Sequence, residues 1–417
     1  MLGACAALVA SVALGASGLR YDVGATAQVS YTTDWETIAP LRSTQLELVP
    51  RLGLSYGERS FDLSLTYDPQ ILTEVSWLPS VLHRAIVSFD LRAARAVRLA
   101  AQVNASYGTN SFRYQSVSLP PPSGTPGTAP GSTGGAEPST PPPPSPPPAT
   151  GPSQTVQPVP IAARATYIQT NAGLGLEIGG GRGFGMKAIL SYTVQGGTDA
   201  ASRLAVPFQR GPTVGVEVDY RLAPGHALAT NLSGSYYTFL AEPPASFAPD
   251  AWTSQLLEAW KYSLSRSSTL QFGLGVGASG NATGFPHLVV KDVTPVADMA
   301  LELGNRLRLT AGYRPFVDFT TGLSSRRVDV YGSMALPLST SWSLVASGGA
   351  AEIVTGPQRD QITASAQVVA SARLVRALRA FGGLTGLWQR AGPDYPAAAL
   401  RQVGLVIGVD FYQGGRL

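Results

Sequence analysis

Phe61-Asp62-Leu63-Ser64-Leu65-Thr66-Tyr67-Asp68 is the stretch that decides the fold, because apolar and polar residues alternate along it without a break. Successive side chains of a β-strand point to opposite faces. The odd-numbered residues of this stretch, all apolar or aromatic, therefore share one face, and the even-numbered residues, all polar, share the other. An apolar face with an aromatic ring at each end suits lipid, and the polar face suits water.

The same alternation recurs about eighteen times along the chain. We expect strands at approximately residues 21–33, 43–56, 60–68, 83–93, 97–108, 165–179, 184–196, 213–222, 226–239, 252–264, 268–280, 296–303, 306–319, 327–338, 342–353, 361–373, 378–390 and 400–412. Most reach or exceed the ~9–11 residues that a tilted strand needs to cross a bilayer. The segment 296–303 is the shortest, unless it begins near Leu288. About sixteen strands is the alternative count.

The breaks between these segments alternate strictly between long and short. Long breaks include residues 69–82 and 109–164, and short ones include residues 57–59 and 223–225. Transmembrane β-barrels have short periplasmic turns and longer extracellular loops. With a periplasmic N-terminus, every long break falls outside. We therefore predict an all-β fold, a transmembrane antiparallel up-and-down β-barrel with short periplasmic turns and long extracellular loops.

The composition favours a barrel over membrane helices. Charged residues make up only 13% of the 417 residues, while the mean hydropathy is a mild +0.09. No stretch after residue 20 approaches the ~18 consecutive apolar residues of a membrane helix. The net charge of +4 is spread without a basic cluster, so we expect no nucleic-acid partner. The single cysteine, Cys5, excludes an internal disulfide.

Residues 1–18, MLGACAALVASVALGASG, are small and apolar and predict a secretory signal peptide that is cut near Ala16. They lack a positively charged beginning, which indicates a true translation start further upstream. Leu2-Gly3-Ala4-Cys5 also resembles a lipobox with a lipidated Cys5, but no apolar run precedes it. We expect residues 19–417 to form a single barrel.

The break at residues 109–164 interrupts the barrel with a proline-rich segment. It holds about half of the chain's 33 prolines, including the run at 141–148. Proline cannot donate to a sheet ladder, so we expect a disordered, hydrated extracellular loop with polyproline-II character. Because the break keeps its place in the alternation, we interpret it as a loop within one barrel and not as a linker between domains. A PxxP ligand for a partner protein is the alternative.

The polar faces of the predicted strands carry charges of both signs. We expect the following residues to line the pore, with Arg221, Asp298, Glu302 and Asp329 facing inward beside them: Glu47, Arg51, Asp62, Arg84, Asp90, Arg92, Arg98, Glu177, Lys187, Glu217, Asp219, Arg308 and Arg314. The interleaved signs indicate either a lattice of ion pairs that stiffens the wall or a conduit with little selection by charge. Glu258 falls on the apolar face of Leu256 and Trp260, so we expect a bulge or a reversed register there.

Candidate catalytic residues are few. The chain has three histidines, His83, His226 and His287, and we expect each near a loop or turn edge. A general base must lie within hydrogen-bond reach of its partner, so His83 with Asp68 is the pair that a barrel hydrolase would use. Residues 179–183, GGGRG, join two strands with no helix behind them, so they are a turn and not a phosphate loop. We predict no enzyme, no cofactor and no metal site.

Aromatic residues lie near both ends of the predicted strands, among them Tyr56 and Tyr220 beside short breaks and Tyr107 and Trp388 beside long ones. In alternation, loop rhythm and aromatic belts, the chain resembles the Gram-negative outer-membrane β-barrels of the porin type over nearly all residues after 20. The last strand carries a terminal aromatic residue at Tyr412, as these proteins do, but five residues follow it.

This resemblance implies a location in the bacterial outer membrane, in contact with its lipid and lipopolysaccharide. About eighteen strands is the count of sugar-specific porins and of barrels that secrete polysaccharide beside a periplasmic export protein. The implied function is a pore for polar solutes or for the export of a polysaccharide, with such a periplasmic protein as a partner. A structural or adhesive barrel that displays the proline-rich loop, and a barrel hydrolase, are the alternatives.

Overall fold

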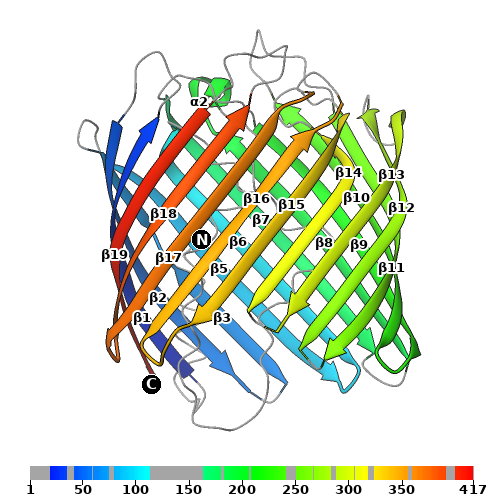
Figure 1. Ribbon diagram of the computed structural model, residues 1–417, viewed down its shortest axis with the longest axis horizontal. Coiled ribbons are helices and arrows are strands. Elements are labelled where there is room, and N and C mark those ends of the chain that lie inside the picture. Colours follow the sequence, from blue (N-terminus) through cyan, green and yellow to red (C-terminus); the bar gives the residue numbers. More distant parts are fainter. Residues whose placement is uncertain are drawn as a thin grey trace.

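The computed structural model describes residues 19–416 apart from 35–41, 59, 75–78, 113–162, 180–182, 206–207, 241–249, 266, 283–287, 305, 318–323, 356–358 and 391–399. The described residues form 19 β-strands and one short helix, and neighbouring strands pair antiparallel (Figure 1). The first part of the chain forms β1 (Leu19–Asp34), β2 (Arg42–Gly57), β3 (Phe61–Tyr67), β4 (Gln70–Glu74), β5 (Ser80–Ala94), β6 (Val97–Phe112), β7 (Ala163–Gly179), β8 (Phe184–Gly197), α2 (Ala200–Ala205) and β9 (Phe208–Ala223). The second part forms β10 (His226–Leu240), β11 (Asp250–Ser265), β12 (Ser268–Ala282), β13 (Leu288–Leu303), β14 (Leu307–Val317), β15 (Ser324–Pro337), β16 (Trp342–Ile353), β17 (Ile362–Val375), β18 (Leu378–Arg390) and β19 (Leu400–Arg416).

The sheet closes on itself to form a barrel. β1 pairs with β2 on one side and with β19 on the other, so that Ala27 lies opposite both Leu48 and Val409. A closed sheet leaves no unpaired edge, and a bilayer tolerates no unpaired edge because it offers no water to satisfy backbone groups. Arg20 and Arg416 lie opposite each other in the ladder between β1 and β19, so β1 begins and β19 ends at the same rim of the barrel. The predicted fold class is confirmed.

β3 and β4 are two halves of one wall strand. β2 pairs with β3 along residues 52–57 and with β4 along residues 45–48. The interruption falls at Asp68-Pro69, where the proline has no backbone N–H to donate. The wall therefore has 18 strands, as the alternation predicts. The loop predicted at residues 69–82 is wrong in extent, because the strand resumes after the proline and β5 already begins at Ser80.

The breaks between wall strands keep the predicted rhythm of long and short. Short turns, such as residues 95–96 and 224–225, lie at one rim, and the longer connections lie at the other (Figure 1). β6 continues to Phe112, further toward the long-loop rim than predicted, and β13 begins at Leu288, which confirms the alternative start for the segment at 296–303. The predicted signal peptide and residues 113–162 of the predicted proline-rich loop lie outside the described residues.

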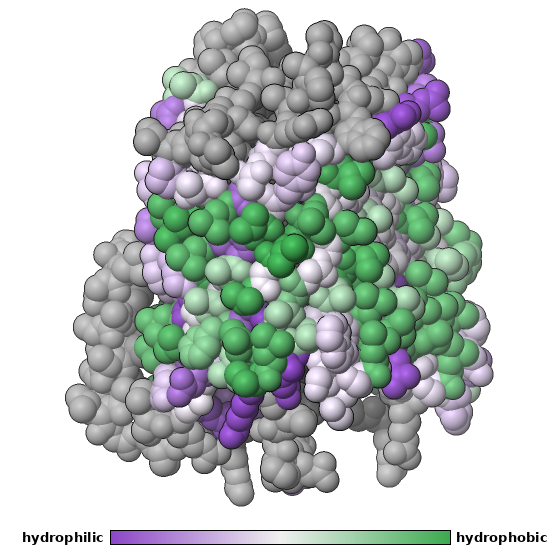
Figure 2. Space-filling view, turned by 60° about the vertical axis from the view of Figure 1, so that its left-hand side comes forward, coloured by the Kyte–Doolittle hydropathy of each residue, from purple (hydrophilic) through white to green (hydrophobic). Residues whose placement is uncertain are grey.

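The outer surface of the wall carries the apolar face. Large apolar side chains are exposed at alternate positions, for example Leu46, Leu48 and Leu52 on β2. On the face that Figure 2 shows, hydrophobic residues form a band across the wall, with hydrophilic residues beneath it. Phe184 and Tyr220, which are exposed at the short-turn rim, form part of an aromatic belt.

Glu258 lies on this outer face, and the bulge or reversed register predicted around it is wrong. The ladders from β11 to β10 and β12 run without a shift through Glu258, and the register changes only between Ser263 and Ser265. The Glu258 carboxylate accepts a hydrogen bond from the Thr230 hydroxyl at 3.0 Å. This bond compensates part of the cost of a charge among apolar neighbours, so regular pairing persists.

α2 interrupts the connection between β8 and β9, where no helix is predicted. The Asp199 carboxylate caps its first turn, accepting the Ser202 backbone N–H and the Ser202 hydroxyl, each at 2.8 Å. The Ser202 hydroxyl in turn accepts the Thr166 backbone N–H at 2.9 Å, which ties the helix to β7. Among the described residues, no helix is both long and apolar enough to cross a membrane.

Candidate functional site

The inner face of the barrel is the polar face of the alternation. Because Leu46, Leu48 and Leu52 are exposed on the outside, the intervening Glu47 and Arg51 point inward. The same parity places the other charged residues predicted to line a pore on the inner face. The structure therefore gathers them on the inner face of two parts of the wall, from β2 to β9 and from β13 to β15.

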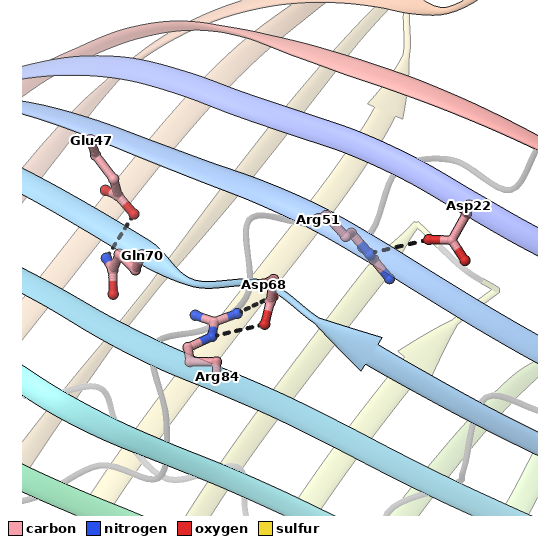
Figure 3. A network of polar contacts seen from close by, with 6 residues as sticks. All are labelled: Asp22, Glu47, Arg51, Asp68, Gln70 and Arg84. Carbon is pink, nitrogen blue, oxygen red and sulfur yellow. Dashed lines mark hydrogen bonds and ion pairs between the residues drawn. The ribbon is translucent and has the colours of Figure 1, made fainter. Parts of the chain in front are cut away.

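Polar contacts connect neighbouring strands on the wall formed by β1 to β5. Figure 3 shows three of them: Arg51 with Asp22 at 3.5 Å, Gln70 with Glu47 at 2.7 Å, and Arg84 with Asp68 at 2.6 Å. Each contact joins side chains from different strand segments, so it restrains the wall across the ladder. Asp22 and Gln70 are absent from the predicted set. Asp22 alternates with the apolar Tyr21 and Val23, which was a sufficient signal, whereas Gln70 falls in the segment that was predicted as a loop.

Charges on the strands from β3 to β9 lie beside charges of both signs. The Arg98 guanidinium pairs with Asp90 at 2.7 Å through Nε and approaches Glu177 at 4.0 Å. Asp62 lies directly across the ladder from Asp90, and Arg92 lies across from Arg98. Lys187 lies across the ladder from Glu177 on β7 and from Glu217 on β9. The inner face here is a mixed-charge surface.

Lys261 on β11 is a central residue that the sequence-based prediction missed. Its ammonium group bonds to Glu217 and, at 2.7 Å, to Asp219, so one cation serves two carboxylates on β9. Glu258 on the apolar face made the register of β11 ambiguous in the sequence. The signal was nevertheless present, since Lys261 has the opposite parity to Leu256 and Trp260.

Arg314, Arg327 and Asp329 form a buried charge cluster between β14 and β15. Asp329 pairs with Arg314 at 2.8 Å and with Arg327 at 3.3 Å, and all three side chains are at most 10% exposed. The Arg327 guanidinium also lies over the Phe316 ring, 5.3 Å from its centroid. By contrast, Arg308 and Glu302 pair at 3.3 Å near the short-turn rim with about 40% of each side chain exposed.

The wall bends sharply where this cluster lies. β11 approaches β14 although two strands separate them in the sheet. A Cβ atom on Gly277 of β12 would lie 2.7 Å from Cγ of Pro315 on β14, so only glycine permits this approach. Phe239, Ala251 and Val317 form a buried apolar cluster across β10, β11 and β14. Sequence alternation contains no signal for this bend, because the contacts join strands that are not neighbours.

The structure does not bring the candidate catalytic pair together. His83 shares a hydrogen bond of 2.7 Å with the Tyr67 hydroxyl, while Asp68 bonds to Arg84 on the other face of the wall. His226 stacks against Trp260 and lies tilted against Tyr262, and His287 lies outside the described residues. Within the described part of the chain, no group of three or more His, Cys, Asp or Glu side chains is placed to hold a metal ion.

A closed wall with an apolar outer face and a charged, ion-paired inner face defines a transmembrane β-barrel of the porin type. The sequence matches the EpsX exopolysaccharide export family over residues 7–417, and the chain therefore belongs to this family. Family membership assigns it an outer-membrane pore or export function. Comparison with curated protein sequences gave no match.

Solved structures of other barrels are similar in fold. OccK2 (OpdF) from Pseudomonas aeruginosa, in complex with glucuronate, is 10% identical over 94% of this chain and 98% of its own, with a TM-score of 0.46. The FrpB iron transporter from Neisseria meningitidis (F5-1 variant) is 10% identical over 90% of this chain, with a TM-score of 0.45. CdiB from Acinetobacter baumannii is 10% identical over 95% of this chain, with a TM-score of 0.40. This chain spans only 64% of that FrpB chain and 60% of CdiB, and these likenesses concern the fold alone.

Proposed function

We propose that the chain forms a water-filled pore in the bacterial outer membrane through which an exopolysaccharide leaves the cell. The observation that carries this proposal is the inner face of the closed 18-strand wall, where paired charges of both signs lie on several groups of strands. Barrels of sixteen or more strands leave an aqueous channel unless a segment plugs them. The pore-lining role of Glu47, Arg98, Glu217 and the other predicted residues belongs to this proposal.

A surface of paired charges suits a hydroxyl-rich polymer. Sugar hydroxyls both donate and accept hydrogen bonds, so they exchange readily among carboxylates, guanidinium groups and water. Because Lys261 is paired with Glu217 and Asp219, and Arg98 with Asp90, no long run of one sign would hold a charged segment in place. Binding along the wall would then be weak and repeated, which lets a chain slide.

We also propose which lipids and which protein contact the barrel. The outer apolar band would contact membrane lipid and, in the outer leaflet, lipopolysaccharide. A β-barrel spans only one membrane, so a polymer made in the cell needs a periplasmic export protein to reach it. We place the docking of that protein at the short-turn rim, where Arg20 and Arg416 also lie. Residues 1–18 would act as the secretory signal.

Two single cysteines at neighbouring positions on opposite faces test this function. Gln102→Cys on β6 places a thiol inside the barrel, and Leu174→Cys on β7 places one on the exposed outer face, both in a Cys5→Ser background. We expect a bulky polymer-linked maleimide to reduce both conductance and surface exopolysaccharide in Gln102→Cys cells and neither in Leu174→Cys cells. Gel mobility measures the extent of labelling.

Unchanged export from fully labelled Gln102→Cys cells whose conductance has fallen would show that the polymer takes another route. A structural or adhesive barrel would then be preferred. Hydrolysis of lipid or peptide by the purified protein, lost in His83→Ala, would favour the barrel hydrolase instead.

A further inference from the structure

A recess of about 260 Å³ opens on the inner wall near the short-turn rim. It crosses from the end of β9 to the beginning of β14, and its polar lining includes Arg221, Lys261, Gln271, Asp298, Glu302 and Thr310. Its volume lies just below the ~300–1,000 Å³ of sites for drug-sized ligands. It therefore suits one ring of a sugar polymer and not an extended segment.

Small residues on β12, β13 and β14 create the hollow. Ala300 lies directly across the ladder from Gln271 on one side and from Thr310 on the other. One step deeper, Asp298 lies between Gly273 and Gly312 in the same way. The short side chain of Ala300 and the two glycines leave space at the bottom of the recess, and the longer polar side chains on the adjacent strands form its sides.

Several polar groups at this floor have no partner within the described part of the chain. The Thr310 hydroxyl has no hydrogen-bond partner, although the residue is only 3% exposed. The structure shows no hydrogen bond to the half-buried Asp298 carboxylate, and the exposed Arg221 side chain at the edge of the recess makes no ion pair among the described residues. A buried polar group without a partner costs free energy. Hydroxyls of a bound ligand would supply these missing bonds.

We infer that this recess binds one uncharged pyranose ring of the exported polymer as it enters the barrel from the periplasm, an inference that rests on the proposed function. Adjacent ring hydroxyls donate to Asp298 and accept from Arg221, and Thr310 and Gln271 can do either. Glu302 is paired with Arg308, and Lys261 with Glu217 and Asp219, so the lining has almost no net charge to attract an acidic sugar. The recess is thus a first holding site at the mouth of the pore.

The test fills the recess without changing a charge. Ala300→Leu places a larger side chain on its floor, and Ala100→Leu is the matched control, because each alanine lies three residues from the short-turn end of its strand. Ala100 lies between Asp90 and Gly175, on a different part of the inner wall. Thr310→Val is a second variant that removes the hydroxyl and keeps the volume. Heat-dependent gel mobility confirms that each variant folds.

The probe is an uncharged glucose hexamer, added to the purified barrel on the short-turn side of a planar bilayer. We expect transient blocks of the current whose apparent Kd rises about tenfold in Ala300→Leu, equivalent to ~1.4 kcal/mol. Thr310→Val should weaken the blocks less, and Ala100→Leu should leave them unchanged. Saturation-transfer NMR on the detergent-solubilised barrel measures the same binding without requiring conductance.

Equal weakening by Ala300→Leu and Ala100→Leu, or no hexamer binding by the wild type in either experiment, would overturn the inference. Tighter binding of a glucuronate hexamer than of the glucose hexamer would also contradict it, because the recess would then select an acid. A barrel that exports polymer and conducts ions but shows no recess-dependent binding would leave the proposed function intact. A barrel that binds the hexamer at the recess but exports nothing would contradict only the proposed function.

Discussion

At single positions, the face on which a side chain lies decides what a new charge costs. Leu65 and Ser64 are neighbours on β3, and Ser64 shares a hydrogen bond of 2.6 Å with Ser88 on the inner face. We predict that Leu65→Arg lowers the free energy of unfolding by about 2–4 kcal/mol, because it exposes a guanidinium to hydrocarbon. Ser64→Arg should cost well below that, since its charge reaches water in the lumen. Urea unfolding in lipid vesicles measures both, and equal losses would show that the two faces are misassigned.

The buried cluster on β14 and β15 makes a second prediction at the residue scale. Asp329→Asn leaves Arg314 and Arg327 buried without their carboxylate, and we expect a loss of about 3–5 kcal/mol in unfolding free energy. Glu302→Gln breaks the exposed pair with Arg308 and should cost at most about 1 kcal/mol. Guanidinium unfolding in detergent compares them. A loss for Asp329→Asn no larger than that for Glu302→Gln would mean that water reaches the cluster.

The face of a residue could be predicted from the sequence, but its partners could not. Alternation alone places Glu47, Arg98 and Glu217 on the polar face. It contains no information on strand stagger, and stagger decides that Lys261 reaches Glu217 and Asp219 on a strand two places away in the sheet. Glu258 shows the opposite limit, because its carboxylate lies on the apolar face, where it accepts a hydrogen bond from the Thr230 hydroxyl.

At the scale of elements, α2 depends on its cap. The Ser202 backbone N–H and then the Ser202 hydroxyl hold the pKa of the Asp199 carboxyl below its usual value. A depressed pKa means that the cap stabilises the helix fully above the unfolded value of about 3.9 and loses this effect as the pH falls through the folded pKa. We predict that backbone hydrogen exchange in residues 200–205, corrected for its intrinsic rate, loses protection in that acidic range.

Asp199→Asn is the control for this prediction, because an amide oxygen still accepts the Ser202 N–H but does not titrate. We expect Asp199→Asn to be nearly independent of pH between about 3 and 6, where the aspartate of the wild type changes charge. The same acid-induced loss of protection in both proteins would show that another group is responsible.

The connection between β6 and β7 makes the next prediction. Phe112 and Ala163 are cross-strand partners, so the chain leaves and rejoins the wall at adjacent positions. We predict that deletion of residues 123–151 leaves folding and membrane insertion intact, because loop-closure entropy changes only slowly with loop length. Heat-dependent gel mobility reports on the folded barrel. Loss of the folded band would mean that the deleted segment contributes contacts to the wall.

Proline is associated with different structures at two places in the sequence. At residues 141–148 a run of prolines predicts a break in the ladder, whereas at Pro69 a single proline interrupts one strand that resumes as β4. The flanking residues Asp68 and Gln70 both bond to neighbouring strands, which keeps the two halves in line. Sequence alone cannot distinguish a strand end from an interruption that side chains on adjacent strands repair.

For the whole molecule, the alternation predicted the strand count, the antiparallel order and the two unlike rims. The alternation could not predict the shape of the barrel's cross-section. The bend that brings Gly277 against Pro315 depends on contacts between non-neighbouring strands, and the recess at Ala300 depends on which small residues meet across the ladders. Both features follow from three-dimensional register, which the period-two pattern leaves open.

The central claim is that the barrel encloses a water-filled pore whose inner charges nearly cancel. Planar-bilayer recording of the purified protein under a salt gradient tests it most directly. The paired charges on the inner face predict stepwise conductance with a reversal potential close to zero. Absence of conductance from correctly folded protein would show that a segment plugs the lumen. A large reversal potential would show that one sign of charge dominates a constriction, and either result would contradict the account.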